Sequence, residues 1–263
     1  MKVDVLNLEG KSIEKVDLPK VFSEKLRQDL ILRAVLSAWS KRRQPYGLNP
    51  LAGLRSSAHY HGRRRIRWSM MEREMARMPR IHGKTTPFLT YRARKVPQAV
   101  KGRVAHPPKV EKIFEQKINK KERQKAIRSA VAATSNKDLV AKRGHKIGDV
   151  KELPIVVEDK IQSVKKTKEI REILKRIGLS KELERIKKKK VRAGRGKARG
   201  RKYKKKIGPL IIITEDKGIS KAVKNLTGVH VSRVENLSAE YLAPGAMPGR
   251  LAIYTKSSLK KLK

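Results

Sequence analysis

The sequence contains no cysteine among its 263 residues. This absence excludes disulfides, thiolate metal sites and cysteine nucleophiles. Apolar stretches are short, and none approaches the roughly 18 residues that a membrane-spanning helix requires, so we expect no membrane partner. The first ten residues contain no apolar signal core, and we therefore expect a cytoplasmic location rather than secretion.

Acidic residues are also scarce. The chain has 24 Asp and Glu against 68 Lys and Arg, a net charge of +44. Self-repulsion at such a charge disfavours a compact chain, so a polyanion is the expected partner. The excess is concentrated, because residues 45–109 carry +13 and residues 185–206 carry +14. The remainder is mildly basic and has enough apolar residues to bury a core.

Strand and helix patterns alternate outside these two segments. Residues 210–214 form a continuous apolar run, typical of a strand covered on both faces. Further strands are expected near residues 3–6, 13–16, 154–158, 229–234 and 251–255. Helices are expected at residues 21–42, 120–133, 137–142, 168–177, 181–186, 219–226, 238–242 and 257–262. This alternation predicts an α/β fold, a three-layer Rossmann-like domain with a largely parallel sheet, formed by residues 1–44 and 110–263.

Two of the expected helices begin with capping signals. Asn119 followed by Glu122 has the spacing of a capping box. Ser180 precedes the helix expected at residues 181–186 and is a candidate N-cap.

Residues 45–109, the central segment, show no sustained period and hold 7 of the 12 prolines. A connection of this length is typical of a functional or disordered loop, and we predict a long extended internal loop. One short helix is expected within it at residues 69–78, ended by Pro79.

The central segment has 11 Arg, 4 Lys and 5 of the chain's 11 aromatic residues. Arginine offers a planar fork for phosphate and a face that stacks on bases, so this composition favours folded RNA over a solvated basic loop. The candidate RNA-binding residues here are Arg55, Arg63, Arg64, Arg65, Arg67, Trp68, Arg92, Arg94, Lys95, Lys101 and Arg103.

Residues 185–206 form a second basic segment, a low-complexity extension within the globular part. It has 14 positive and no negative side chains, with glycines among them. Such a run can follow a phosphate backbone and become ordered on binding. A targeting signal or an electrostatic tail is the alternative. The candidate RNA-binding residues in this segment are Arg192, Arg195, Lys197, Arg199 and Arg201.

Weaker motifs predict no cofactor. Gly83-Lys84-Thr85 resembles the end of a phosphate-binding loop, but Met78 stands where the first glycine belongs and no strand precedes it. The glycines at 194, 196 and 200 have GxGxxxG spacing and do not follow a strand, so a dinucleotide site is not expected.

Residues that could serve metal binding or acid–base catalysis are isolated. His59 and His61 could ligate a metal, but no cysteine exists and Glu72 is the nearest carboxylate after His61, so RNA contact or solvent exposure is favoured. Glu158-Asp159 and Glu215-Asp216 follow two expected strands, and we interpret them as turn and helix-cap residues. We predict no catalytic residue, no metal and no cofactor.

Longer blocks of sequence carry a family resemblance. These blocks are Pro45-Tyr46-Gly47, residues 94–103 (RKVPQAVKGR), residues 105–108 (AHPP), residues 121–130 (KERQKAIRSA), residues 193–197 (AGRGK), Pro244-Gly245 and residues 249–251 (GRL). Through them the chain resembles the universal large-subunit ribosomal protein L-four family from end to end. No long C-terminal extension of the eukaryotic kind is present, which favours the archaeal type.

The resemblance implies a structural constituent of the large ribosomal subunit that is not an enzyme. It implies an α/β body on the outside of the subunit, bound to large-subunit ribosomal RNA and neighbouring ribosomal proteins. It also implies an extended loop that reaches the polypeptide exit tunnel and helps to form its constriction. The loop tip, expected within residues 55–80, would then lie near the nascent polypeptide.

Two other classes of protein share part of this pattern. An enzyme on a nucleotide-binding α/β domain would need a glycine-rich turn directly after a strand, and the sequence has none. A DNA-compacting protein would share the charge but not the arginine-rich, aromatic segment between two halves of a core.

Overall fold

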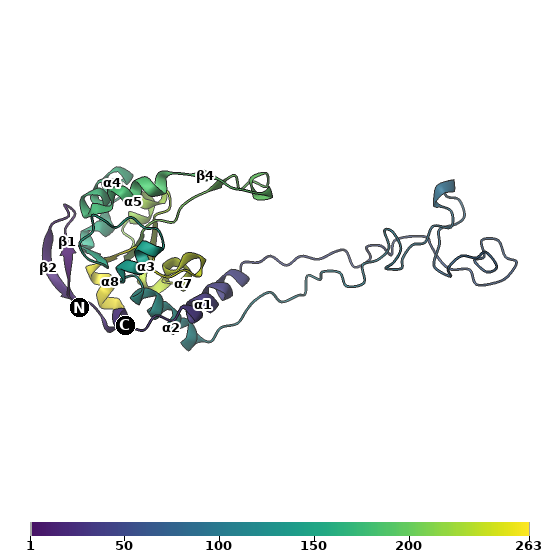
Figure 1. The fold of residues 1–263 in the computed structure, drawn as a ribbon, viewed down its shortest axis with the longest axis horizontal. Helices are drawn as coiled ribbons and strands as arrows, with labels where there is room; N and C mark the ends of the chain where they lie inside the picture. The colour runs from purple at the N-terminus through teal and green to yellow at the C-terminus, as the bar shows by residue number, and fades with distance from the viewer. Residues whose placement is uncertain (1, 263) are drawn as a thin grey trace. The chain divides into compact units, whose positions relative to one another are not determined.

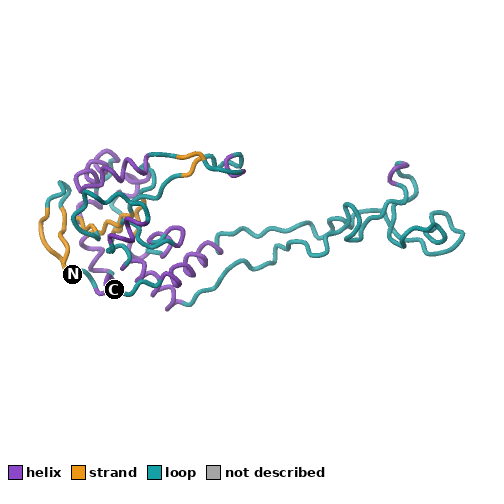
Figure 2. Tube along the Cα trace, in the orientation of Figure 1, coloured by secondary structure: helices purple, strands orange, loops and turns teal. Residues whose placement is uncertain are grey.

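The computed structural model describes residues 2–262 and divides them into two compact units. One unit, the body, comprises residues 2–42 and 115–262. The other, the loop unit, comprises Arg43–Phe114. Figure 1 shows the fold, and Figure 2 shows that helices and strands gather in the body whereas most of the loop unit is loop.

The body is built on a six-stranded sheet. Its strands are β1 (Lys2–Leu6), β2 (Ser12–Asp17), β3 (Ile155–Val157), β6 (Leu210–Ile213), β7 (His230–Arg233) and β8 (Ala252–Thr255). Their order is β2-β1-β3-β8-β6-β7. Only β2 runs antiparallel, at one edge, because it forms a hairpin with β1. The largely parallel sheet confirms the α/β prediction.

Helices cover both faces of the sheet. They are α1 (Gln28–Ser40), α2 (Lys120–Ala132), α3 (Lys137–Lys142), α4 (Thr167–Leu174), α5 (Ser180–Lys187), α6 (Ile219–Lys224), α7 (Ala239–Leu242) and α8 (Lys256–Lys261). One apolar cluster joins α1, α2, α7 and α8 to the sheet, and a second joins α3, α4, α5 and α6 to it. The body therefore has three layers, as the sequence predicts.

Strand β6 shows why both faces are covered. Leu210 and Ile212 belong to the first cluster, whereas Ile211 and Ile213 belong to the second. Side chains of a strand alternate between faces, so an uninterrupted apolar strand needs helices on both sides. All four residues are fully buried.

The first helix is shorter than predicted. Lys20–Ser23 forms a separate 3-10 turn, and α1 begins only at Gln28. Val21 and Phe22 are buried in the first cluster, which draws this turn onto the sheet. The hydroxyl of Ser129 accepts a hydrogen bond from the Arg27 backbone N–H at 2.7 Å, just before the helix starts.

Neither predicted capping bond forms. Asn119 occupies the N-cap position of α2 but makes no side-chain capping bond, and Glu122 instead pairs with Arg33 of α1 at 3.1 Å. Ser180 is already helical and caps nothing. Three further caps were not expected from the sequence, and their side chains accept hydrogen bonds from the backbone of α3, α7 and α8: Asn136, Ser238 and Thr255.

The helix predicted at residues 69–78 is also wrong. These residues form turns and irregular backbone, and Glu72 and Glu74 have positive φ angles of 65° and 52°. An amphipathic helix is stabilised mainly by packing its apolar face. The loop unit offers little to pack on, because its buried residues are Ala58, Ser69 and Met70.

Candidate nucleic-acid interface

The two limbs of the loop unit lie against each other near their ends. The Leu48 N–H donates to the Pro108 carbonyl at 3.1 Å. Gly53 has φ of 79°, and a Cβ there would lie 2.5 Å from the Gly102 carbonyl oxygen. A Cβ on Gly102 would lie 1.9 Å from the Val96 carbonyl oxygen of its own limb. Gly53 therefore lets the two limbs run in contact where no side chain fits, and Gly102 permits a tight turn within one limb.

Three backbone segments meet farther along the loop unit. Isolated antiparallel bridges pair Arg80 with His59 and with Ala93. The Arg80 guanidinium donates to the carbonyls of Tyr91 and Ala76, both at 2.8 Å. Arg80 therefore holds the loop together, a role that its place in a basic segment did not reveal.

The predicted arginines of the loop unit are mostly exposed. No hydrogen bond or ion pair within residues 2–262 occupies the side chains of Arg55, Arg63, Arg65, Arg92, Lys101 or Arg103. Arg64 pairs with Glu72 at 3.2 Å, yet both side chains stay more than 60% exposed. Most of these cations are thus free to contact an external phosphate.

The other predicted residues of the loop unit have contacts inside it. The guanidinium carbon of Arg67 lies 5.1 Å from the ring centroid of Trp68. The half-buried Arg94 donates to the Val100 carbonyl, and Lys95 is also half-buried. Trp68 is half-buried and lies against His82 and Tyr91, with ring centroids 5.9 and 5.7 Å away. These side chains shape the loop as well as presenting charge.

The loop unit exposes apolar surface and holds unusual backbone. It makes up about a quarter of the chain but carries 11 of the 21 exposed large hydrophobic residues found within residues 2–262, among them Phe88 at 73% exposure. It also holds seven of the eight non-glycine residues with positive φ in the described chain. Such conformations cost of order 1–3 kcal/mol each and persist only where surroundings enforce them. Exposed apolar surface of this extent is typical of an interaction site.

Residues 188–206, the basic arm, form a hairpin that the sequence analysis did not predict. Strands β4 (Lys190–Val191) and β5 (Tyr203–Lys204) pair antiparallel. The Arg192 N–H donates to the Lys202 carbonyl at 2.8 Å, and its Nε donates to the Arg201 carbonyl at 3.1 Å. Two-residue strands leave no alternating apolar pattern, so no signal could have revealed them.

The predicted residues of the arm lie at or beyond these strands. Arg195, Lys197, Arg199 and Arg201 are exposed, whereas Arg192 is half-buried. The chain turns among them at Gly194 and Gly200, whose φ angles are 79° and 75°. The hairpin end therefore presents cations in several directions.

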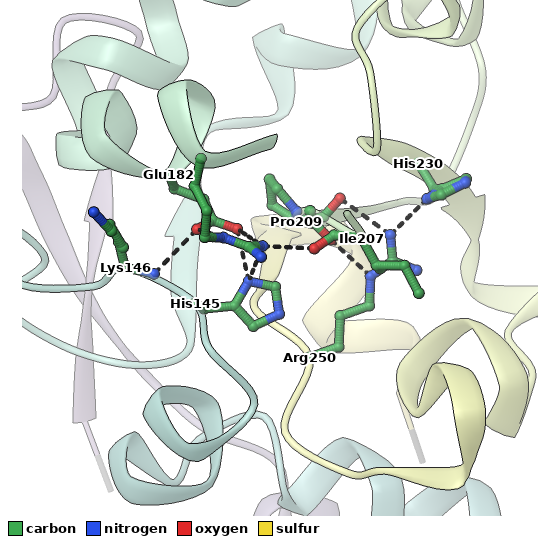
Figure 3. A network of polar contacts seen from close by, with 9 residues as sticks. His145, Lys146, Glu182, Ile207, Pro209, His230 and Arg250 are labelled. Atoms are coloured by element: carbon green, nitrogen blue, oxygen red, sulfur yellow. Dashed lines mark hydrogen bonds and ion pairs between the residues drawn. The ribbon is translucent and has the colours of Figure 1, made fainter. Parts of the chain in front are cut away.

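A buried ionic cluster fixes the start of the arm to the body (Figure 3). Glu182 of α5 is fully buried and accepts from His145 Nδ1 at 2.7 Å, from the Lys146 N–H at 3.0 Å and from Arg185 at 2.6 Å. Arg185 also donates to the Ile207 carbonyl at 2.6 Å, on the returning side of the arm. One carboxylate thus joins both ends of the arm through Arg185.

The contacts within this cluster shift the pKa values of Glu182 and His145. Burial alone would raise the pKa of Glu182, but hydrogen bonds from Arg185, His145 and the Lys146 N–H outweigh burial and leave that pKa below its ordinary value. Burial lowers the pKa of His145, and its bond to Glu182 offsets this only partly. The neutral imidazole donates its Nδ1–H to a carboxylate.

Arg250 fixes the residues after the arm (Figure 3). Its side chain is 1% exposed and donates to the carbonyls of Gly208 at 2.9 Å and Tyr241 at 2.8 Å, and it contacts His230 Nδ1 at 2.6 Å. Burial, together with the charge of Arg143, lowers the pKa of Arg250 to about 9. Backbone carbonyl oxygens take the place of water around the buried guanidinium. These bonds fix the residues between the arm and β6.

The weaker motifs have structural roles or none. Asp216 caps the turn before α6 by accepting from the N–H groups of Gly218 and Ser220, which confirms its interpretation as a cap. Asp159 accepts from the Ser257 N–H at 2.9 Å in the first turn of α8. Gly83-Lys84-Thr85 lies in irregular backbone. No described helix has the length and apolar character needed to cross a membrane.

Fold and surface together define an α/β protein with a basic loop unit and a basic arm. A model of the ribosomal protein L4/L1 family matches residues 16–263. The chain belongs to this family, which confirms the resemblance found in the sequence.

Curated relatives agree with the family match. The large ribosomal subunit protein uL4 of Archaeoglobus fulgidus is 48% identical over 268 residues, covering 100% of this chain and 98% of the relative. The protein of Methanosphaera stadtmanae is 46% identical, and the match covers 99% of this chain and 96% of the relative. The protein of Nanoarchaeum equitans is 47% identical, and the match covers 100% of this chain and 98% of the relative. These relatives are archaeal, as the sequence predicted.

Proposed function

We propose that this chain is a structural constituent of the large ribosomal subunit in the cytoplasm and that it binds large-subunit ribosomal RNA. Its relatives are named as large-subunit proteins, and its family is structural rather than enzymatic. The body anchors two basic extensions, and arginine and lysine in those extensions relieve phosphate repulsion so that RNA helices can pack closely.

The observation that carries this proposal is the composition of the loop unit. It buries only Ala58, Ser69 and Met70 and leaves most of its arginines without an internal acceptor. A free loop of this kind cannot hold its conformation by its own core. Burial among RNA supplies phosphate for the guanidinium groups and base faces for exposed rings such as Phe88.

RNA is favoured over duplex DNA by the same surface. Exposed aromatic rings stack on unpaired bases, which folded RNA offers and duplex DNA does not. Most arginine contacts should be to phosphate and sugar, which position the protein without reading sequence. Specificity then comes from fit to a folded RNA and not from base recognition.

The finer placement is our proposal and rests on what the sequence resemblance implies. We place the loop unit along the polypeptide exit tunnel, with residues 55–80 near the nascent polypeptide at the constriction, and we place neighbouring large-subunit proteins around the body. The proposed RNA-binding residues remain those named from the sequence, from Arg55 to Arg103 in the loop unit and from Arg192 to Arg201 in the arm. No catalytic step and no cofactor belong to this role.

Sedimentation of cell extract through a sucrose gradient tests the proposal. We expect the chain to travel with large subunits and to remain with them through a moderate salt wash. A chain that sediments with chromosomal DNA, or alone near the top of the gradient, would refute the assignment. Nucleotide-dependent thermal stabilisation of the purified chain would favour the enzyme alternative instead.

A further inference from the structure

Three histidines of the loop unit converge on one point. The ring centroids of His59, His61 and His82 are 4.4, 4.2 and 4.4 Å apart, and one nitrogen of each ring lies within 4.8 Å of the others. His61 Nε2 and His82 Nε2 are only 2.8 Å apart. From the sequence, His59 and His61 were expected to contact RNA or solvent and not a metal. His82 was not among the candidate ligands, because it is 21 residues away from His61.

The backbone explains why the three rings meet. His59 and His61 are two residues apart in extended chain, so their side chains leave on the same side. The bridge between His59 and Arg80 brings the second segment alongside, and His82 follows Arg80 by two residues. The Met70 N–H also donates to the His61 carbonyl at 3.3 Å. Three parts of the loop unit therefore position the cluster.

The surroundings prepare these rings to act as metal ligands. His59 Nδ1 lies 3.1 Å from the Ser57 carbonyl, so Nδ1 carries the proton and Nε2 keeps its lone pair. Trp68 stacks on His82 with an interplanar angle of 18° and covers one side of that ring. A ring nitrogen with a free lone pair is the form of histidine that binds a metal.

The donor set selects the ion. Three imidazole nitrogens and no carboxylate make up the cluster among the described residues. Mg²⁺ and Ca²⁺ require oxygen ligands, whereas imidazole suits Zn²⁺ and its neighbours. Tetrahedral Zn–N bonds of about 2.0–2.1 Å place ligand nitrogens roughly 3.3 Å apart. The 2.8 Å between His61 Nε2 and His82 Nε2 is about 0.5 Å shorter than this spacing, so these two rings move apart when the ion binds.

We propose that His59, His61 and His82 bind one Zn²⁺ ion that fastens the far part of the loop unit. Water takes the fourth position, because three protein ligands leave it open. The ion joins residues 59–61 to residue 82 in a unit that buries only Ala58, Ser69 and Met70. Metal binding there replaces the core that the segment lacks. This site is independent of the RNA-binding role.

Zinc titration of the untagged full-length chain against a chromogenic chelator tests the site. The test variants are His61→Asn and His82→Asn, and the control is His106→Asn, which alters an exposed histidine of the loop unit outside the cluster. We expect one Zn²⁺ per chain for the wild type and the control, no competition from Mg²⁺, and at least about tenfold weaker binding for each test variant. Wild-type affinity in both test variants, or no stoichiometric binding by the wild type, would overturn the proposal.

Limited trypsin digestion supplies a second readout. Seven arginines lie between His61 and His82, within the segment that the ion would close. Zinc should slow cleavage there in the wild type and in His106→Asn, but not in His82→Asn. Equal cleavage with and without zinc in the wild type would also overturn the proposal. Loss of zinc binding with RNA binding intact would separate this inference from the proposed function.

Discussion

Replacement of Arg63, Arg64, Arg65 and Arg67 by alanine should weaken RNA binding and flatten its dependence on salt. All four side chains are exposed, and only Arg64 has an acidic partner, Glu72, which is itself 63% exposed. Each phosphate contact to single-stranded nucleic acid contributes about 0.7 to the slope of log K against log salt. Four lost contacts therefore lower the slope by about 3.

This slope difference is large enough to measure. When salt rises from 50 to 200 mM, the wild type should lose roughly 50-fold more RNA affinity than the variant, because the two slopes differ by about 2.8. Filter binding of the full-length chain to a large-subunit RNA transcript, at five or more salt concentrations, gives both slopes. A circular dichroism spectrum of each protein checks that the body is folded.

A control variant separates contact from overall charge. Replacement of Lys15, Lys168, Lys221 and Lys224 by alanine removes the same charge from exposed positions on the body. We expect this variant to keep most of the wild-type slope. An unchanged slope in the arginine variant, or equal flattening in both variants, would remove the four arginines from the interface.

Three further predictions concern the body. Replacing residues 55–80 by a short Gly-Ser linker should leave one cooperative unfolding transition by calorimetry, and loss of cooperativity would refute the proposed domain boundaries. Arg250→Met should lower the free energy of unfolding by about 3 kcal/mol, since buried carbonyls lose their donor, whereas Arg233→Met on the exposed face of β7 should change it by less than about 0.5 kcal/mol. Burial lowers the pKa of His145 and of His230 below 6.5, so the unfolded chain binds more protons and the melting temperature should fall as pH drops from 7.5 to 5.5; a rise would mean that His145 is protonated in the fold.

The body could be predicted from sequence because its signals are local. The apolar run that became β6 and the helical stripe that became α2 are each recognised from a few neighbouring residues, and both elements formed within a residue or two of the prediction. The residues of β6 are buried on alternate faces because the side chains of a strand alternate. The α/β class could therefore be predicted without a structure.

The contacts that fix the candidate site were harder to predict from the sequence, because they join residues far apart in the chain. Glu182 and His145 are 37 residues apart, and Arg250 meets the Gly208 carbonyl 42 residues away. Nothing in the local pattern distinguishes these charges from surface charges. His82 shows the same limit, because only the bridge at Arg80 brings it to His59.

The helix prediction failed in the loop unit for a related reason. Residues 69–78 were expected to form a short helix ended by Pro79, but a helix there would have no apolar surface to pack against. Met70 is buried and the backbone around it turns instead. A local helix signal predicts a helix only where a core exists for it to pack against.

Cross-linking of purified large subunits by ultraviolet light, followed by mass spectrometry, tests the central claim most directly. If both extensions are buried among RNA strands, peptides from residues 45–109 and 188–206 should carry most of the RNA cross-links, with Arg63 to Arg67 among them. Cross-links confined to the helices of the body, with both extensions unmodified, would contradict the account.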